Sequence, residues 1–331
     1  MLAMMALAAP AAADAASVSV TGDDGNPIAV APGAPPTIRN MRPDVGVAFP
    51  PGDGRYKITI TNAAGNAVNN ATSCRSRSLL GPYTVEYTGN GAYVVTITNF
   101  AANDFNCVTP QTTETFGFFI AASTAVTAPA THLLRAPGSF ATNPLAVSVA
   151  QNPGASSLEV RFAPFATIGP DGAIAGNSTR TIADSATGVA QLRFDGPGVY
   201  TVVARPTRFS SAGEVGGPWS APVRVVVLAP FDISGGLQFL DSRGPSYSVR
   251  IQLREKSARG RVSVALARGS RGGKYRSLGS AKISSLGTVT KRFRARRAGA
   301  YRLRFSYRGA QSILGGRAVF PIRIRRTISF G

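Results

Sequence analysis

Apolar and polar residues alternate with a period of two in short runs along most of the chain. Clear runs occupy residues 56–60, 93–98, 158–162, 200–204 and 223–228. This period places successive side chains on opposite faces of a β-strand. Clusters of Gly, Pro, Asn and Asp separate the runs, as in Pro170-Asp171-Gly172 and Asp195-Gly196-Pro197-Gly198, and such clusters form turns. The pattern predicts an all-β chain of antiparallel sheets.

A Gly-x-Tyr motif stands before such a run three times, ending at Tyr93, Tyr200 and Tyr301. The tyrosines are 107 and 101 residues apart, about the length of one β-sandwich domain. We therefore predict three tandem antiparallel β-sandwich domains, each long enough to bury its own core. The expected bounds are 17–121, 131–229 and 230–331. Residues 122–130 are expected to be a linker, and the Gly/Pro-rich joins permit bending.

Two motifs of the second unit resemble those of fibronectin type III and related bacterial immunoglobulin-like domains. Gly-x-Tyr precedes the expected penultimate strand, and Trp219-Ser220-Ala221-Pro222-Val223 precedes the last. In such sandwiches the tyrosine packs its ring inward and hydrogen-bonds its hydroxyl to nearby backbone. The resemblance thus implies corner roles for Tyr93, Tyr200 and Tyr301. Trp219 is expected to pack, although a sugar-stacking role is the alternative.

The third unit contains an aromatic–x–x–Leu-Gly run at residues 275–279 and the run Tyr301-Arg302-Leu303-Arg304. With these two runs it resembles accessory sandwich modules of secreted actinobacterial proteins. The resemblance covers about a third of the unit and implies a cell-envelope or extracellular setting without a defined ligand.

The first residues of the chain are typical of a secretory signal peptide that lacks its basic start. Residues 1–13 are apolar and alanine-rich and end in an Ala-x-Ala pattern, so residues 1–16 are expected to be the signal peptide. A frayed alanine-rich terminus is the alternative. No later stretch has 18 consecutive apolar residues, so no transmembrane segment is expected. The predicted localisation is extracellular or in the cell envelope.

The chain has two cysteines, Cys74 and Cys107, both in the first unit. In an exported protein two cysteines of one domain most simply form a disulfide. Closing this loop is expected to stabilise the fold by about 3–4 kcal/mol on the chain-entropy model. Two ligands without a nearby histidine do not make a metal site.

Charge is distributed unevenly between the units. Residues 1–229 contain 13 basic and 13 acidic residues, whereas residues 230–331 contain 23 basic and three acidic ones and so carry the whole formal net charge of +20. A disordered basic tail would be poor in apolar residues, but this segment is rich in Val, Ile, Leu, Phe and Tyr. We therefore predict a folded basic domain.

Arginines of this domain alternate with apolar residues, which predicts an arginine-rich outer surface. The candidate polyanion-binding residues are Arg302, Arg304, Arg308, Arg323 and Arg325, together with Arg292 and Arg294, which flank Phe293. Guanidinium groups suit phosphate and carboxylate geometry. The expected partners are a phosphate- or uronate-bearing wall polymer or anionic lipid headgroups, with nonspecific nucleic-acid binding at low salt only. Codon bias and protection of edge strands are the alternative explanations.

The residue inventory argues against catalysis and against a cofactor. His132 is the one histidine and is expected at the surface, and no serine lies in a nucleophile motif. Asp23-Asp24-Gly25-Asn26 is expected to be a turn with carboxylates facing water, with a calcium site as the alternative. No metal, cofactor or enzymatic activity is therefore expected. A secreted hydrolase using His132 or a carboxylate pair is the least favoured alternative.

Together these features predict a non-enzymatic exported protein. The two neutral domains are interpreted as spacer or contact modules, and the basic domain as an anchor to an anionic envelope component. The alternative is an adhesin-like module whose protein- or glycan-binding site lies in the neutral domains.

Overall fold

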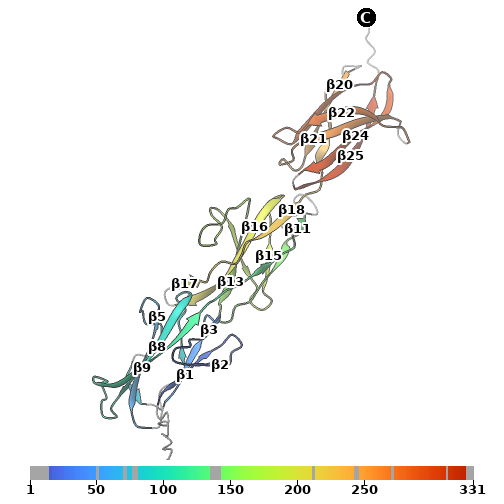
Figure 1. The fold of residues 1–331 in the computed structure, drawn as a ribbon. Helices are drawn as coiled ribbons and strands as arrows, with labels where there is room; N and C mark the ends of the chain where they lie inside the picture. Colours follow the sequence, from blue (N-terminus) through green and yellow to red (C-terminus); the bar gives the residue numbers. More distant parts are fainter. Residues whose placement is uncertain are drawn as a thin grey trace, which may run out of the picture.

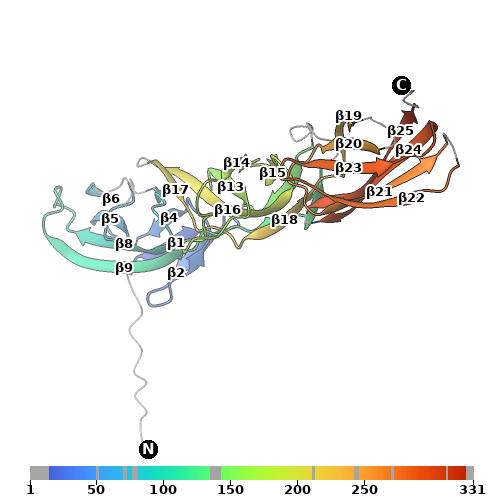
Figure 2. The ribbon, with the colours of Figure 1, turned by 90° about the horizontal axis from the view of Figure 1, so that it is seen from above.

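The computed structural model describes residues 15–49, 52–69, 73–76, 81–134, 143–210, 213–241, 246–269, 272–310 and 312–325. In these ranges all regular secondary structure is β-strand, as the alternation predicts, and no helix could cross a membrane. The expected signal peptide lies outside the described residues up to residue 14. Six sheets follow one another in pairs along an elongated molecule (Figures 1 and 2).

The first pair of sheets is formed by residues 17–120. Its strands are β1 (Ser17–Thr21), β2 (Pro27–Val30), β3 (Thr37–Ile38), β4 (Asp44–Ala48), β5 (Arg55–Asn62), β6 (Arg75–Ser76), β7 (Tyr83–Thr84), β8 (Gly91–Phe100) and β9 (Pro110–Ile120). One sheet has the order β2-β1-β4-β7 and the other β3-β9-β8-β5-β6. The inward residues of β5, Tyr56, Ile58 and Ile60, are buried in the shared core, as the period of two requires.

The second pair is formed by residues 126–228. Its strands are β10 (Val126–Thr127), β11 (Thr131–Leu133), β12 (Leu145–Val149), β13 (Ser157–Pro164), β14 (Thr179–Ala183), β15 (Val189–Leu192), β16 (Gly198–Ser210), β17 (Gly213–Gly216) and β18 (Val223–Leu228). One sheet has the order β10-β12-β15. The other has the order β11-β18-β16-β13-β14, with β17 paired to β16.

The third pair is formed by residues 233–324. Its strands are β19 (Ile233–Asp241), β20 (Ser246–Leu253), β21 (Arg261–Arg268), β22 (Arg276–Lys282), β23 (Thr288–Arg294), β24 (Gly299–Ala310) and β25 (Ile313–Ile324). The sheet orders are β19-β20-β23 and β22-β21-β24-β25. The long antiparallel hairpin β24–β25 forms one side of this unit.

The three motif tyrosines make the same hydrogen bond. The hydroxyls of Tyr93, Tyr200 and Tyr301 each donate to the carbonyl oxygen four residues upstream, at 2.8, 3.0 and 2.8 Å. Their rings are buried in the cores. Each tyrosine therefore fixes the turn that enters a long strand, β8, β16 or β24.

The connections between the units form backbone hydrogen bonds with the neighbouring strands. Residues 122–130, expected to be a linker, contain β10, which pairs with β12. At the next join the Ala229 N–H donates to the Ser312 carbonyl, and the Leu314 N–H donates to the Ala229 carbonyl, both at 2.8 Å. The buried residues of the second and third pairs form one continuous cluster. Backbone hydrogen bonds therefore order both joins in this structure.

Two side-chain details of the first pair bear on the sequence predictions. A disulfide joins Cys74 and Cys107, whose Cα atoms are 5.6 Å apart. The Asp23 carboxylate accepts hydrogen bonds from the N–H groups of Arg39 and Asn40, at 2.6 and 3.0 Å. Asp23 and Asp24 are both exposed, as expected for this turn, and Asp23 in addition fixes the segment before β4.

Candidate anion-binding face

The hairpin β24–β25 places the predicted arginines according to its alternation. Tyr301, Leu303 and Phe305 are buried in the core, so the even-numbered residues of β24 face outward. In the register Ala300 pairs with Arg323 and Ser306 pairs with Arg317, and paired residues of neighbouring strands point to the same side of a sheet. We call this outer surface the arginine face, which comprises Arg302, Arg304, Arg308, Arg317 and Arg323.

One member of the arginine face was missed in the sequence. Arg317 precedes Ala318-Val319-Phe320 and continues the odd-numbered outward set of β25 toward its start. The alternation from Arg323 backwards would have identified it. Arg325 lies just beyond the end of β25 and is exposed.

Arg302 and Arg304 pack under an aromatic ring rather than extending freely into water. Their guanidinium carbons lie 5.3 and 4.1 Å from the ring centroid of Tyr275. Both Nε atoms are buried without a hydrogen-bond partner. A buried donor that lacks a partner costs free energy, and stacking on a ring offsets part of the cost. The Tyr275 ring thus holds two like charges in fixed positions.

Within the described residues, no carboxylate forms an ion pair with the arginine face. Among the described residues, the one ion pair of the third unit joins Arg254 Nε to Asp232 Oδ2 at 3.1 Å, and neither residue belongs to the face. Glu255 follows Arg254 in the sequence. Burial raises the pKa of the Glu255 carboxyl, and this effect outweighs the positive charge of Arg254, which lowers the pKa. Like charges on adjacent strands destabilise a sheet, so the arginine face carries an electrostatic cost.

The other two predicted arginines lie on the opposite side of this unit. Phe293 of β23 is buried, so Arg292 and Arg294 point away from the core on the second sheet, β19-β20-β23. Arg250 of β20 faces the same way, because it pairs with the outward Thr290. We call Arg250, Arg292 and Arg294 the opposite face. The structure therefore divides the predicted arginine set into two clusters.

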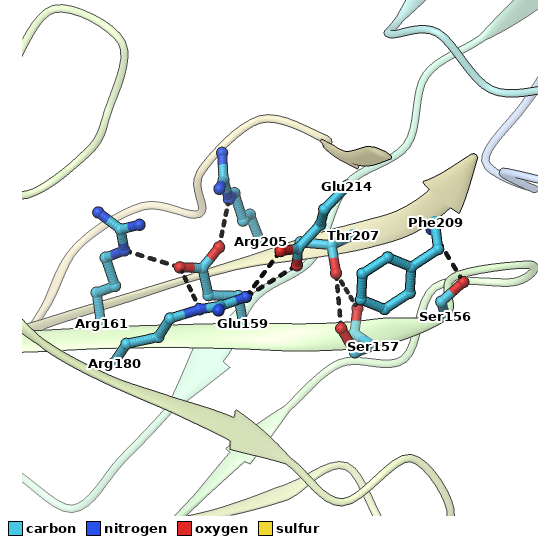
Figure 3. A network of polar contacts seen from close by, with 9 residues as sticks. All are labelled: Ser156, Ser157, Glu159, Arg161, Arg180, Arg205, Thr207, Phe209 and Glu214. Carbon is cyan, nitrogen blue, oxygen red and sulfur yellow. Dashed lines mark hydrogen bonds and ion pairs between the residues drawn. The ribbon is translucent and has the colours of Figure 1, made fainter. Parts of the chain in front are cut away.

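The second unit has a comparable arginine cluster with a carboxylate at its centre (Figure 3). Glu159 of β13 has a side chain with 0% exposure. Its carboxylate accepts hydrogen bonds from Nε of Arg161 and Arg205 at 2.8 Å each, and forms an ion pair with Nε of Arg180 at 3.0 Å. Arg180 Nη2 also pairs with Glu214 at 2.9 Å. Burial by itself raises the pKa of Glu159, but the hydrogen bonds from Arg161 and Arg205 outweigh it and hold the pKa below its usual value.

Trp219 covers this cluster. Its ring lies 5.2 Å from the Arg161 guanidinium carbon and 4.5 Å from that of Arg205, and it packs against buried Ala163 and Val203. Trp219 is thus a packing residue, as expected. Tyr275 likewise stacks on Arg302 and Arg304, so both sheets carry an aromatic ring over arginines.

The strand pairs β13–β16 of the second unit and β21–β24 of the third carry different residues at one equivalent register position. Glu159 pairs with Arg205, five residues after Tyr200. In the third unit the pair five residues after Tyr301 is Ser306 with Ser263. The carboxylate that neutralises the arginines in the second unit is therefore replaced by a serine beside the arginine face.

Among the described residues, no hydrogen bond, ion pair or ring contact joins the candidate catalytic residue of the sequence, His132, to an acid or a nucleophile. His132 is half-buried in β11; its Nε2 lies 3.0 Å from the Asn143 carbonyl oxygen, and its ring lies 5.7 Å from that of Phe194. His132 is thus partly exposed, and Phe194 packs against one side of its ring. In the part of the chain that the structure describes, no three His, Cys, Asp or Glu side chains cluster as metal ligands would.

Comparison with known proteins leaves the chain without an assigned family. No family model and no curated protein matches the sequence. The fold is similar to a tetra-tandem repeat in the extending region of a large adhesion protein, with 12% identity over 94% of this chain and 92% of that one, at a TM-score of 0.38. It is also similar to chicken CNTN1 FN1–FN3 domains, with 12% identity over 88% and 99% of the two chains, at a TM-score of 0.21. At these identities and TM-scores the similarity assigns neither a family nor a function.

Proposed function

We propose that the protein is a non-enzymatic, exported component of the cell envelope or extracellular space. In this proposal the first two units are spacer or contact modules, and the arginine face binds an anionic envelope polymer or lipid headgroups. The elongated arrangement of the units suits a spacer (Figure 2). The disulfide between Cys74 and Cys107 suits an oxidising compartment.

The observation that carries the proposal is the absence of a carboxylate beside the arginine face, within the ranges that the structure describes. Codon bias toward arginine would act equally on every unit, yet the arginine cluster of the second unit is neutralised by Glu159 and Glu214. An anionic ligand would supply to the arginine face the negative charge that Glu159 supplies to the arginines of the second unit. Phosphate groups fit this role because guanidinium forks bind them through paired N–H donors.

Sequence-specific nucleic-acid reading is not part of the proposal. Of the aromatic residues of the hairpin, Tyr301, Phe305 and Tyr307 are buried in the core and Phe320 is partly buried against it. Tyr275 already stacks on two arginines. A platform for stacking bases is therefore lacking among these residues. Binding to nucleic acid is expected to be nonspecific and to vanish as salt rises.

Cosedimentation of the full chain tests the proposal. The chain is mixed with purified bacterial cell walls, phosphatidylglycerol vesicles or neutral phosphatidylcholine vesicles, between about 50 and 200 mM NaCl. We expect retention by at least one anionic surface, loss of that retention at higher salt, and none by the neutral vesicles. Retention by walls but not by phosphatidylglycerol identifies the polymer as the ligand, and the reverse result identifies the lipid. Equal retention by neutral and anionic surfaces, or none by any surface, contradicts the proposal.

A further inference from the structure

The first and second units meet through a fixed contact. The Met41 N–H donates to the Pro153 carbonyl at 2.8 Å, and Arg39 Nη2 donates to the Gln151 carbonyl at 3.1 Å. Gly154 has a φ of +72°, and a Cβ there would overlap Asn40 Oδ1. These contacts join the segment before β4 to the loop before β13.

A polar cleft of about 440 Å³ lies at this junction. Its walls come from the first unit, through Arg42, Asn69 and Thr84, and from the second unit, through the end of β16 with Arg208 and Phe209. The volume lies within the range of about 300–1,000 Å³ that is typical of small-molecule sites. The cleft exists only where the two units meet.

Two arginines without an acidic partner face the cleft. Arg208 is half-buried and its Nη1 donates to the Gly154 carbonyl at 3.1 Å. Among the described residues, neither Arg208 nor Arg42 pairs with a carboxylate, although Glu86 also lines the cleft. Burial and then the positive charge of Arg42 lower the pKa of Arg208. The junction thus brings two positive side chains to one cleft.

An exposed aromatic ring lies at the edge of the same cleft. Phe209 is 60% exposed, and its backbone N–H donates to Ser156 Oγ at 3.2 Å, which fixes this end of β16 (Figure 3). An exposed ring beside two unpaired guanidinium groups, with amide and hydroxyl side chains on the walls, fits a ligand that has a carboxylate, hydroxyl groups and an apolar C–H face. A uronic acid has these three features, whereas a simple phosphate lacks the apolar face.

We propose that this interdomain cleft binds a uronic-acid residue of an acidic glycan. Arg42 and Arg208 bind the carboxylate, and Phe209 packs against the sugar ring. The site lies in the two neutral units and is separate from the arginine face, so binding to either can fail without the other.

Calorimetric titration of the full chain with a glucuronate-containing disaccharide tests this site. Glucose and inorganic phosphate serve as the neutral-sugar and simple-anion comparisons. We expect saturable binding of the disaccharide, which Arg42→Gln and Arg208→Gln each weaken at least about tenfold, since each removes a charge-assisted hydrogen bond. Phe209→Ala is expected to weaken binding as well, and Arg193→Gln, an exposed arginine of the second unit, to leave it unchanged.

Several results overturn the proposal. These are the absence of saturable binding, equal binding of glucose, equal binding of phosphate, and unchanged binding by both cleft variants. Because Arg208 also contacts the Gly154 carbonyl, its variant is checked for an unchanged thermal transition, and Arg42→Gln tests the site without touching that hydrogen bond. Binding that persists after charge reversal of Arg308, Arg317 and Arg323 assigns it to the cleft. Loss of binding in that variant assigns the sugar to the arginine face instead.

Discussion

The guanidinium carbon of Arg304 lies 4.1 Å from the ring centroid of Tyr275, while its Nε has no hydrogen-bond partner. The ring therefore orders the charge of this guanidinium group. Arg302 shares the ring at 5.3 Å. This arrangement preorganises Arg302 and Arg304, two of the five members of the arginine face.

Replacing Tyr275 is predicted to weaken polyanion binding through loss of this order. Tyr275→Ala removes the stacking on Arg302 and Arg304, each worth about 0.5–1 kcal/mol at an exposed site. Tyr275→Phe keeps the ring and should bind as the wild type does. Cosedimentation with anionic vesicles, together with thermal unfolding, measures both effects. Equal binding by the alanine and phenylalanine variants would show that the ring has no such role.

Removal of the central carboxylate of the second unit is predicted to destabilise that unit. Glu159→Gln leaves Arg161, Arg180 and Arg205 beside one another without their shared anion. We expect a loss of roughly 2–3 kcal/mol, less than for a fully buried pair because the arginines are partly exposed. Trp219, the one tryptophan, lies in this cluster, so its fluorescence during urea unfolding reports on this unit. Glu214→Gln, which removes one ion pair of a partly exposed acid, should cost under about 1 kcal/mol.

The same ion cluster predicts a dependence of stability on pH. Because the pKa of Glu159 in the folded protein lies below its usual value of 4.5, its ionised form stabilises the fold above that pH. The stabilisation is lost as pH falls through the folded-state pKa. The difference in unfolding free energy between wild type and Glu159→Gln should therefore be constant near neutral pH and shrink below about pH 4.5. If this difference in unfolding free energy instead grows as the pH falls, the pKa of Glu159 in the folded protein is raised rather than lowered, which contradicts the prediction.

Gly154→Ala is predicted to disturb the junction between the first two units. The positive φ alone costs an L-residue about 1–2 kcal/mol, and the added Cβ would also overlap Asn40 Oδ1 and the Arg42 N–H. Gly176→Ala is the matched control, since φ there is +84° with nothing within 4 Å of the added Cβ. We expect small-angle scattering to detect a bent or loosened molecule for Gly154→Ala only. Equal scattering profiles for the two variants would mean that the junction does not depend on this close approach.

Most of the arginine face could be predicted from the alternation of apolar residues and arginines in β24 and β25. Burial of Tyr301, Leu303 and Phe305 follows from the period of two, and the outward position of Arg302, Arg304 and Arg323 follows with it. The stacking of Tyr275 could not be predicted, because it depends on how the segment before β22 packs across the sheet.

Other features depend on contacts between residues far apart in the chain. Alternation places Glu159 on the outside of its sheet, yet its side chain is completely buried because arginines from three strands and Trp219 cover it. Arg42 and Arg208 are separated by more than a domain length, and the junction alone brings them to one cleft. The sequence pattern of either unit contains no information on that contact.

The central claim is that position on the arginine face, and not net charge alone, determines polyanion binding. Two triple variants of the full chain remove the same charge: Arg308, Arg317 and Arg323 to Glu on the arginine face, and Arg250, Arg292 and Arg294 to Glu on the opposite face. The measurement is the affinity for phosphatidylglycerol vesicles between about 50 and 200 mM NaCl. We predict that the first variant lowers the slope of log affinity against log salt by about 3, one for each lost contact, while the second keeps the wild-type slope. Equal loss of affinity and slope in both variants would contradict the claim.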